Sequence, residues 1–222
     1  MRLPSLTPKE HLLAQLRREG IADERVIDAL RRIPREVFIP PAFQGRAYEN
    51  TALPIASRQT ISQPYVVARM AEALRLTGTE HVLEVGTGSG YGAAVLAELA
   101  LTVVTIEILD DLAEAAASRL ANLGYTNVSV VVGDGSLGWP AAAPYHAISV
   151  TASSPQVPIA LVKQLSPRGG RLVAPIGSLH QQELILIERF DQRVQRHSLG
   201  QVRFVPLLGA AGFQALDPAR KN

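Results

Sequence analysis

The stretch LEVGTGSGYGAA, residues 83–94, joins a short apolar run to a helix-forming run through closely spaced glycines. Gly86, Gly88 and Gly90 follow the apolar run directly and precede the segment YGAAVLAEL. A turn of this kind presents backbone N–H groups and the positive end of a helix to an anionic or polar group. Gly88, Gly90 and Ala93 also match the spacing G-x-G-x-x-A of dinucleotide-binding enzymes. The stretch predicts a ligand-binding strand, turn and helix but leaves the ligand open.

Short β-rich apolar runs recur from His81 onward, and helical segments separate most of them. The runs are HVLEV, TVVTIE, VSVVV, AISVT and RLVAP. Each is too continuous to have a solvent-facing side, which is typical of a parallel sheet covered on both faces. We therefore predict an α/β fold with a doubly wound, Rossmann-like, mostly parallel sheet, helices on both faces and a ligand at the carboxyl ends of the strands. After Pro175, the segments ELILIERF, RVQRHSL and VRFVPL predict antiparallel strands.

A helical extension is expected before the glycine turn. The segment TPKE at residues 7–10 is a capping box, and Asp23 can cap a second helix that ends near Pro34. Gln63 and Pro64 open a third helix that runs to about residue 76. The region between the second and third helices, from VFIPPAF to LPIASRQTISQ, has no sustained period and is expected to be an extended loop lying over the rest.

The length of 222 residues suits one domain. We expect a single domain whose parts are the N-terminal helices and cleft loop (1–77), the ligand-binding core (78–180), the C-terminal strands (181–210) and a tail (211–222).

Composition excludes several classes of function. The net charge is only +2 and the basic residues are scattered, so no nucleic-acid partner is expected. No apolar run approaches the ~20 residues that cross a bilayer, so no membrane partner is expected. The chain has no cysteine, and its five histidines lie far apart, so no metal site is expected. We predict a cytoplasmic protein and expect a monomer.

Glu84 narrows the choice of ligand. It stands two residues before Gly86, near the carboxyl end of a buried strand, where a carboxylate would repel a pyrophosphate. A positively charged ligand is favoured, and S-adenosylmethionine carries both an ammonium and a sulfonium. The alternative is that Glu84 pairs with a lysine or arginine from the N-terminal loop.

Two further carboxylates end the next strands. Glu107 follows the glycines by about twenty residues and can accept both hydroxyls of a ribose in either ligand class. Asp134, in VVVGDGS, can accept a hydrogen bond from an adenine amino group while Gly135 lets the ring approach. An ordinary Asp-Gly turn is the alternative for Asp134.

The motifs VLEVGTGSGY, VVTIE, GDGSLGW and YHAISVTASSPQVP, in that order, resemble those of class I S-adenosylmethionine-dependent methyltransferases. TISQPYVVARM, VFIP, AYENTALPI and VRFVPL narrow the resemblance to the protein-L-isoaspartate O-methyltransferase family, from about Arg18 to Leu207. Two positions depart from the family pattern. His146 stands where aspartate is more usual, and Arg58 replaces a glycine ahead of QTISQP.

The resemblance implies methyl transfer from S-adenosylmethionine to the free α-carboxylate of isoaspartyl residues in damaged proteins and peptides. The ester then cyclises to a succinimide, which reopens partly to aspartate. The implied cofactor-binding residues are Glu84, Gly86, Thr87, Gly88, Gly90, Glu107, Ile108, Asp134, Gly135 and Thr151, and the implied substrate-binding residues are Pro54, Thr60, Ile61 and Val205.

Ser62 is the candidate for orienting the reacting carboxylate, since the resemblance places its hydroxyl there. Its alternative role is to cap the helix that Pro64 opens. YENTALPI and VRFVPL are expected to flank the substrate cleft, where an extended peptide would pair with a strand edge. Tyr65 and Phe204 either line this cleft or belong to the core.

Four other functions stay open. The glycines allow an NAD-dependent oxidoreductase, although no hydride-transfer partner is evident and Glu84 would be unexplained. A methyltransferase of exocyclic base amines would carry an Asn/Asp-Pro-Pro-aromatic stretch where this chain has ASSP. The remaining two are a small-molecule methyltransferase and a cofactor-binding protein without catalysis.

Overall fold

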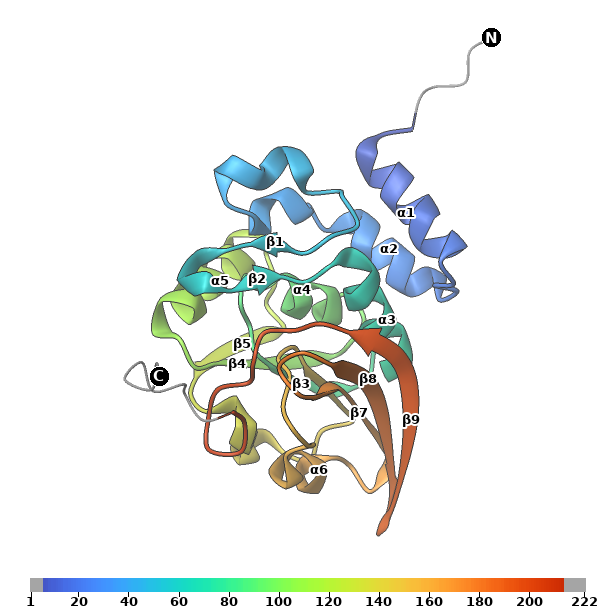
Figure 1. Cartoon of the computed structure of the whole chain (residues 1–222), viewed down its shortest axis with the longest axis vertical. Helices are drawn as coiled ribbons and strands as arrows, with labels where there is room; N and C mark the ends of the chain where they lie inside the picture. Colours follow the sequence, from blue (N-terminus) through green and yellow to red (C-terminus); the bar gives the residue numbers. More distant parts are fainter. Residues whose placement is uncertain (1–5, 214–222) are drawn as a thin grey trace.

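A seven-stranded sheet forms the centre of the protein in the computed structural model, which describes residues 6–213 (Figure 1). The strands lie in the order β5-β4-β3-β6-β7-β8-β9. The first five run parallel to one another, β8 pairs antiparallel with β7, and β9 pairs antiparallel with β8. Their bounds are β3 His81–Val85, β4 Thr102–Glu107, β5 Val128–Val132, β6 Ala147–Val150, β7 Arg168–Gly177, β8 Gln182–Phe190 and β9 Arg193–Val202. The predicted α/β class with a mostly parallel sheet is confirmed.

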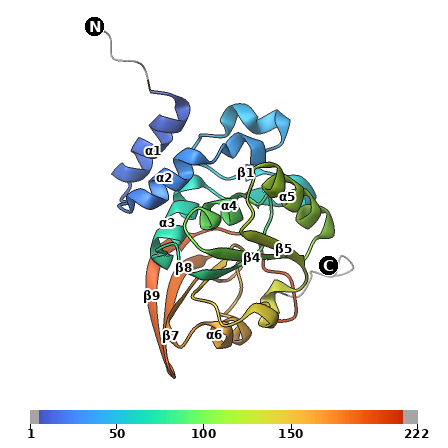
Figure 2. The same cartoon turned by 180° about the vertical axis from the view of Figure 1, so that it is seen from behind.

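Six α-helices surround this sheet within residues 6–213 (Figures 1 and 2). They are α1 Pro8–Arg18, α2 Glu24–Arg32, α3 Pro64–Leu74, α4 Tyr91–Ala97, α5 Asp110–Asn122 and α6 Ile159–Gln164. The expected N-caps are confirmed, since the side chains of Thr7 and Asp23 accept hydrogen bonds from first-turn backbone N–H groups. In this part of the chain, no helix has the length and apolar character needed to cross a bilayer.

The hydrophobic core is divided between the two faces of the sheet. Side chains alternate along a strand, so β3 directs Val82 to one face and Leu83 and Val85 to the other. The first face packs against α1 to α4, and the second packs against α6 and the segment around Leu207. Glu84 shares the face of Val82 and therefore lies beneath α4, beside Gly92.

The region between α2 and α3 is not the extended loop that the sequence predicts. It forms three 3-10 helices, η1 Arg35–Phe38, η2 Pro41–Arg46 and η3 Ala56–Arg58, and a small hairpin of β1 Leu53–Pro54 and β2 Thr60–Ile61. Prolines preset the backbone for the first two 3-10 turns. Apolar side chains spread along the region are buried in the first core and hold it in place: Phe38, Ile39, Ala47, Leu53 and Ile61.

Arg58 lies at the tip of this hairpin with a φ of 57°, next to Ser57 with a φ of 54°. Both residues are in the left-handed region, where glycine has no steric cost. The arginine therefore occupies the backbone conformation for which the family pattern has glycine. The Ser57 hydroxyl donates to Asp111 at 2.6 Å and fastens the tip to α5.

The prediction of a separate strand at VRFVPL is wrong. β9 continues through Gly200 to Val202, with a register shift opposite Leu184 and Ile185. The Phe204 N–H donates to the side-chain carbonyl of Gln182 at 2.6 Å, and the Gln182 amide donates back to the Phe204 carbonyl at 3.3 Å.

Part of the backbone of this segment is thus bonded within the chain, since the Val205 carbonyl also accepts from the Ser153 N–H at 2.8 Å. The free edge of the sheet on this side is β9. The expectation that every strand lacks a solvent-facing side fails at β5, which is the opposite edge strand and leaves Val132 54% exposed.

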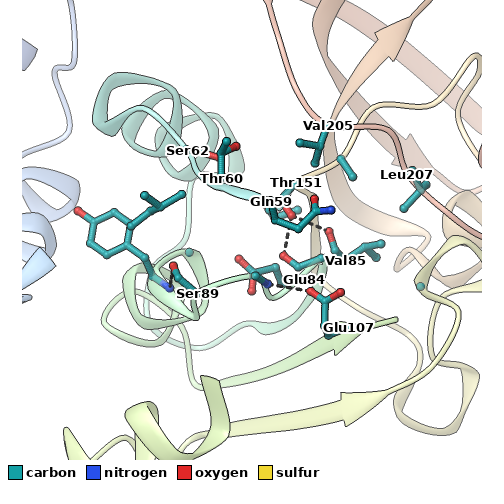
Figure 3. A pocket seen from close by; sticks show the side chains of 18 of the residues that line it. Gln59, Thr60, Ser62, Glu84, Val85, Ser89, Glu107, Thr151, Val205 and Leu207 are labelled. Atoms are coloured by element: carbon teal, nitrogen blue, oxygen red, sulfur yellow. Dashed lines mark hydrogen bonds between the residues drawn. The ribbon is translucent and has the colours of Figure 1, made fainter. Parts of the chain in front are cut away.

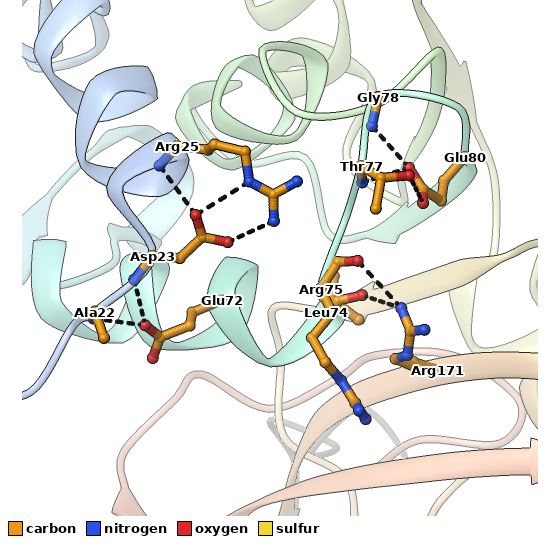
Figure 4. A network of polar contacts seen from close by, with 10 residues as sticks. All are labelled: Ala22, Asp23, Arg25, Glu72, Leu74, Arg75, Thr77, Gly78, Glu80 and Arg171. Atoms are coloured by element: carbon orange, nitrogen blue, oxygen red, sulfur yellow. Dashed lines mark hydrogen bonds and ion pairs between the residues drawn. The ribbon is translucent and has the colours of Figure 1, made fainter.

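A polar network joins the N-terminal helices to α3 (Figure 4). The Glu72 carboxylate accepts hydrogen bonds from the backbone N–H groups of Ala22 at 2.7 Å and Asp23 at 2.9 Å, and it pairs with Arg69 at 3.0 Å. A carboxylate that accepts backbone N–H bonds at a helix start also opposes the helix dipole favourably. Glu72 therefore fixes the start of α2 against α3.

We expect Glu72→Ala to lower the free energy of unfolding by about 1.5 kcal/mol, because two backbone donors lose a charged acceptor. The measurement is urea denaturation followed by circular dichroism. Glu49→Ala is the matched control, since Glu49 pairs with Arg46 on the surface and such pairs contribute little. Equal losses in the two variants would contradict the role given to Glu72.

Candidate active site

A cavity lies at the carboxyl ends of β3 and β4, directly over the glycine turn (Figure 3). It is the position at which a doubly wound sheet binds its ligand. Many of the predicted site residues line it: Thr60, Ile61, Ser62, Glu84, Gly86, Gly88, Glu107, Ile108, Gly135, Thr151 and Val205.

A second cavity adjoins the first. Thr60, Ser62, Thr151 and Val205 line both, so the two cavities meet around these four residues. The second cavity is also lined by Tyr65, Arg69, Leu199, Gln201, Arg203 and Phe204. The two cavities therefore adjoin beside Ser62.

The glycine turn has backbone angles that require glycine. The φ angles of Gly86, Gly88 and Gly90 are 92°, 53° and 88°. Space is also limited, because a Cβ on Gly86 would overlap the Thr151 hydroxyl. That hydroxyl donates to the Gly86 carbonyl at 2.6 Å, which holds the turn against the strand β6.

Glu84 is a buried carboxylate without a cationic partner. It is 1% exposed, and none of the ion pairs within residues 6–213 includes it. The Thr105 hydroxyl donates to it at 2.6 Å, and the Thr87 hydroxyl lies 2.6 Å from that of Thr105. Burial, reinforced by the charge of Glu107, raises the pKa of Glu84 to about 8 despite the Thr105 bond. The alternative of a lysine or arginine partner for Glu84 is wrong.

Gly92 is a site residue that the sequence analysis missed. A Cβ at this position of α4 would overlap Oε1 of Glu84, so glycine leaves room for the carboxylate where it lies. A glycine inside a helix lowers helix stability by about 1 kcal/mol relative to alanine. A glycine in the predicted helix YGAAVLAEL was therefore the signal that could have indicated a special role for Gly92. Gln59, Ser89 and Leu207 also line the cavity, but nothing in their residue types or spacing indicates it.

Backbone N–H groups hold the Glu107 carboxylate in place. One oxygen accepts from Gly88 at 2.8 Å, and the other accepts from Ile108 at 3.0 Å and Leu109 at 3.2 Å. These bonds connect the end of β4 to the glycine turn. The carboxylate still lines the cavity, so its orientation toward a ligand is set in advance.

Asp134 forms the Asp-Gly turn that was its alternative role. Its carboxylate accepts from the Ser136 N–H at 2.9 Å, from the Ser136 hydroxyl at 2.6 Å and from the Ala210 N–H at 2.7 Å. It thereby fastens the segment after Leu207 beside the cavity. Gly135 lines the cavity, whereas Asp134 lines neither cavity.

Three other predicted residues lie outside both cavities: Thr87, Gly90 and Pro54. The Thr87 side chain turns toward Thr105, and Gly90 is the N-cap of α4 and packs against α5. His146 lies at the amino end of β6, where its Nδ1 accepts from the His81 N–H at 3.1 Å. This is the end of the sheet opposite the cavity.

Ser62 does not cap α3. The N-cap is Gln63, and no side chain makes a capping bond there. The Ser62 carbonyl accepts from Arg35 at 2.9 Å, and Ser62 lines both cavities beside Thr60 (Figure 3). No cluster of three or more potential metal ligands occurs in the described part of the chain.

Comparison with known sequences identifies relatives along nearly the whole chain. Residues 7–212 match the family model of protein-L-isoaspartate(D-aspartate) O-methyltransferase. A protein-L-isoaspartate O-methyltransferase of Herpetosiphon aurantiacus is 54% identical over 200 residues, which are 90% of this chain and 89% of the relative. One of Methanoculleus marisnigri is 52% identical over 200 residues, with 90% of each chain covered.

Solved structures agree with these matches. A protein-L-isoaspartate O-methyltransferase superposes with a TM-score of 0.81 at 31% identity, covering 91% of this chain and 66% of the other. A Plasmodium falciparum structure of the same name, in complex with S-adenosyl-L-homocysteine, gives a TM-score of 0.76 at 25% identity and covers 92% and 99%. The chain belongs to the protein-L-isoaspartate(D-aspartate) O-methyltransferase family.

Proposed function

We infer that Ser62, Glu84 and Glu107 carry out, in this chain, the reaction of its family. That reaction is transfer of a methyl group from S-adenosylmethionine to the free carboxylate of L-isoaspartyl residues in damaged proteins and peptides, which starts repair through a succinimide. One observation supports these roles: two cavities adjoin beside Ser62. The first of them is lined by the carboxylates of Glu84 and Glu107 and by the glycine turn.

The first cavity fits S-adenosylmethionine, which supplies a methyl group on a positively charged sulfur. Glu84 is a buried acid in need of a cation, and it would hold the ammonium of the cofactor. Glu107 would accept the ribose hydroxyls, because backbone bonds already orient it. Gly86, Gly88 and Gly135 would let the cofactor approach the backbone. Ile108 and Thr151 line the same cavity and would complete the set.

The second cavity suits an anionic peptide. No aspartate or glutamate lines it, whereas Arg69 and Arg203 do. Arg69 is paired with Glu72, so Arg203 is the cation more available to a substrate. Leu199 and Gln201 bring the free edge of β9 to the same cavity, and backbone pairing of an extended peptide would take place there.

Orientation supplies the catalysis in this proposal. A carboxylate has a pKa of about 4 and is already ionised at neutral pH, so no general base is needed. The Ser62 hydroxyl would donate a hydrogen bond to the substrate carboxylate and aim one of its oxygens at the first cavity. Holding reacting atoms roughly 3 Å apart in line removes much of the barrier to such a transfer.

Other expectations remain predictions from the sequence. They are the cytoplasmic location, the monomeric state, the lack of nucleic-acid or membrane partners, the part boundaries within the single domain, and cofactor or substrate contacts of Thr87, Gly90, Asp134 and Pro54.

The substrate assignment is tested with two peptides that are identical except for one isoaspartyl or one aspartyl linkage. We expect labelled methyl groups from S-adenosylmethionine to reach only the isoaspartyl peptide, since only it has a free α-carboxylate, its main chain continuing through the side-chain carboxyl. The measurement is base-labile methanol. Equal labelling of both peptides, or labelling of neither while the cofactor still binds, would redirect the assignment to small-molecule substrates.

Cofactor binding should depend on pH through Glu84. With a pKa of about 8 in the free protein, Glu84 is mostly protonated at pH 7, and a bound ammonium favours its ionised form. Affinity for S-adenosylhomocysteine should therefore rise from pH 6 to pH 8, by at most about tenfold per unit, with release of a proton. Calorimetry in buffers of different ionisation enthalpy measures both quantities.

Glu84→Gln is the matched control, because the amide keeps an acceptor for Thr105 but cannot ionise. We expect the affinity of Glu84→Gln for S-adenosylhomocysteine to be at least about tenfold weaker than that of the wild type at pH 8, because one ion pair is lost. This affinity should not change between pH 6 and pH 8. Proton uptake, or the same pH profile in both proteins, would show that Glu84 does not hold the ammonium.

Ser62→Ala should lower kcat about 10- to 100-fold with less than a twofold change in the Kd of S-adenosylhomocysteine, since the hydroxyl acts on the carboxylate and not on the cofactor. Single-turnover methyl transfer and calorimetry measure the two effects. A large fall in Tm with intact turnover would instead identify a structural role.

A further inference from the structure

Arg35 is a buried guanidinium without a carboxylate partner. It lies in η1 and is 1% exposed, and none of the ion pairs described within residues 6–213 involves it. Burial of an unpaired cation costs several kcal/mol and lowers the pKa of this arginine. Contacts that an apolar side chain cannot make must offset this cost.

Those contacts join three segments that are far apart in sequence. Nε of Arg35 donates to the Ala47 carbonyl at 2.9 Å, and Nη2 donates to the Ser62 carbonyl at 2.9 Å. The guanidinium carbon lies 4.6 Å from the centre of the Tyr91 ring, in a cation–π arrangement. Tyr91 is the first residue of α4, directly after the glycine turn.

A column of side chains extends this connection to the cofactor side. The Tyr91 ring meets the Phe38 ring edge-on at 5.5 Å, and the guanidinium of Arg119 lies 5.9 Å from the Phe38 ring. Nη1 of Arg119 donates to the carbonyl of Ser89 at 2.6 Å. The column therefore runs from the peptide of Ser62 to the peptide of Ser89, and both residues line the first cavity.

Regular secondary structure does little to hold Ser62. It follows β2, which has only two residues, and precedes Gln63, the N-cap of α3 that lacks a side-chain capping bond. An error of about 1 Å in the position of an orienting group can cost about a hundredfold in rate. A side chain that fixes the Ser62 peptide therefore bears directly on the reaction.

We propose that Arg35 is a positioning residue, which holds the Ser62 peptide against α4 so that the Ser62 hydroxyl stays at the junction of the two cavities. The proposal rests on the orienting role of Ser62 given above. Arg35 itself lines neither cavity, so it acts through Ser62 and not on substrate or cofactor.

Arg35→Lys tests this geometry, because an ammonium keeps the charge but lacks the planar fork that reaches two carbonyls and stacks on a ring. We expect kcat to fall about 10- to 100-fold, while the KM for the isoaspartyl peptide and the Kd of S-adenosylhomocysteine change less than about twofold. Arg35→Met is the second variant. It removes the buried charge at similar volume, a change that proteins often tolerate, and its kcat should fall at least as far.

Arg171→Lys is the matched control. Nη1 of Arg171 also donates to backbone carbonyls, those of Leu74 at 2.7 Å and Arg75 at 3.3 Å (Figure 4). Its buried Nε has no hydrogen-bond partner, as is true of Nη1 of Arg35. Arg171 belongs to β7 and contacts the carboxyl end of α3, whereas Ser62 precedes the amino end of that helix. A fall in Tm with unchanged kcat is expected.

The deciding measurement repeats the Arg35 variants in a Ser62→Ala background. If Arg35 acts through Ser62, its substitution should lower kcat less than about twofold further there, since coupled residues are not additive. The same loss in both backgrounds, or an unchanged kcat in the folded Arg35 variants, would overturn the proposal while leaving Ser62 in its role. Wild-type turnover in Ser62→Ala alone would overturn both.

Discussion

The site is built around a buried acid without a cationic partner, the Glu84 carboxyl group in the middle of the sheet. A buried acid without a cation is costly, and the surrounding residues accommodate it in specific ways. Thr105 on the neighbouring strand donates to it, Thr87 approaches Thr105, and Gly92 leaves the space it occupies. The pairing of β3 with β4, the glycine turn and the start of α4 are thus organised for a ligand that brings positive charge.

The sequence predicted the elements whose signals are local. Thr7 and Asp23 indicated the starts of α1 and α2, and the apolar runs indicated the parallel strands. The hairpin between β1 and β2 was missed because its order comes from the burial of side chains such as Leu53 and Ile61 in a distant core. The misassigned strand at VRFVPL has the same origin, since the amide of Gln182, more than twenty residues away, satisfies the backbone of Phe204.

The residues of the candidate site also divide into those with a local sequence signal and those fixed by distant contacts. Glu84, Glu107 and Ser62 could be predicted because charge or motif singled them out, and the structure places them in one cavity. Asp134 was ambiguous for a physical reason, since an Asp-Gly pair makes the same turn whether or not a ligand is near. The column from Arg35 to Arg119 had no sequence signal at all. Cation–π and edge-on ring contacts join residues without any fixed spacing.

The close approach of Gly92 to Glu84 also constrains how this chain can evolve. A methyl group at position 92 would favour the helix but would overlap Oε1 of Glu84 where it lies, so the benefit requires the Glu84 side chain to move or residue 84 to become shorter. The two positions are therefore epistatic: the order in which they mutate decides whether each intermediate protein is functional. A lineage that keeps Glu84 in this position to bind the cofactor therefore favours glycine at position 92 of α4, although alanine would be the better helix former.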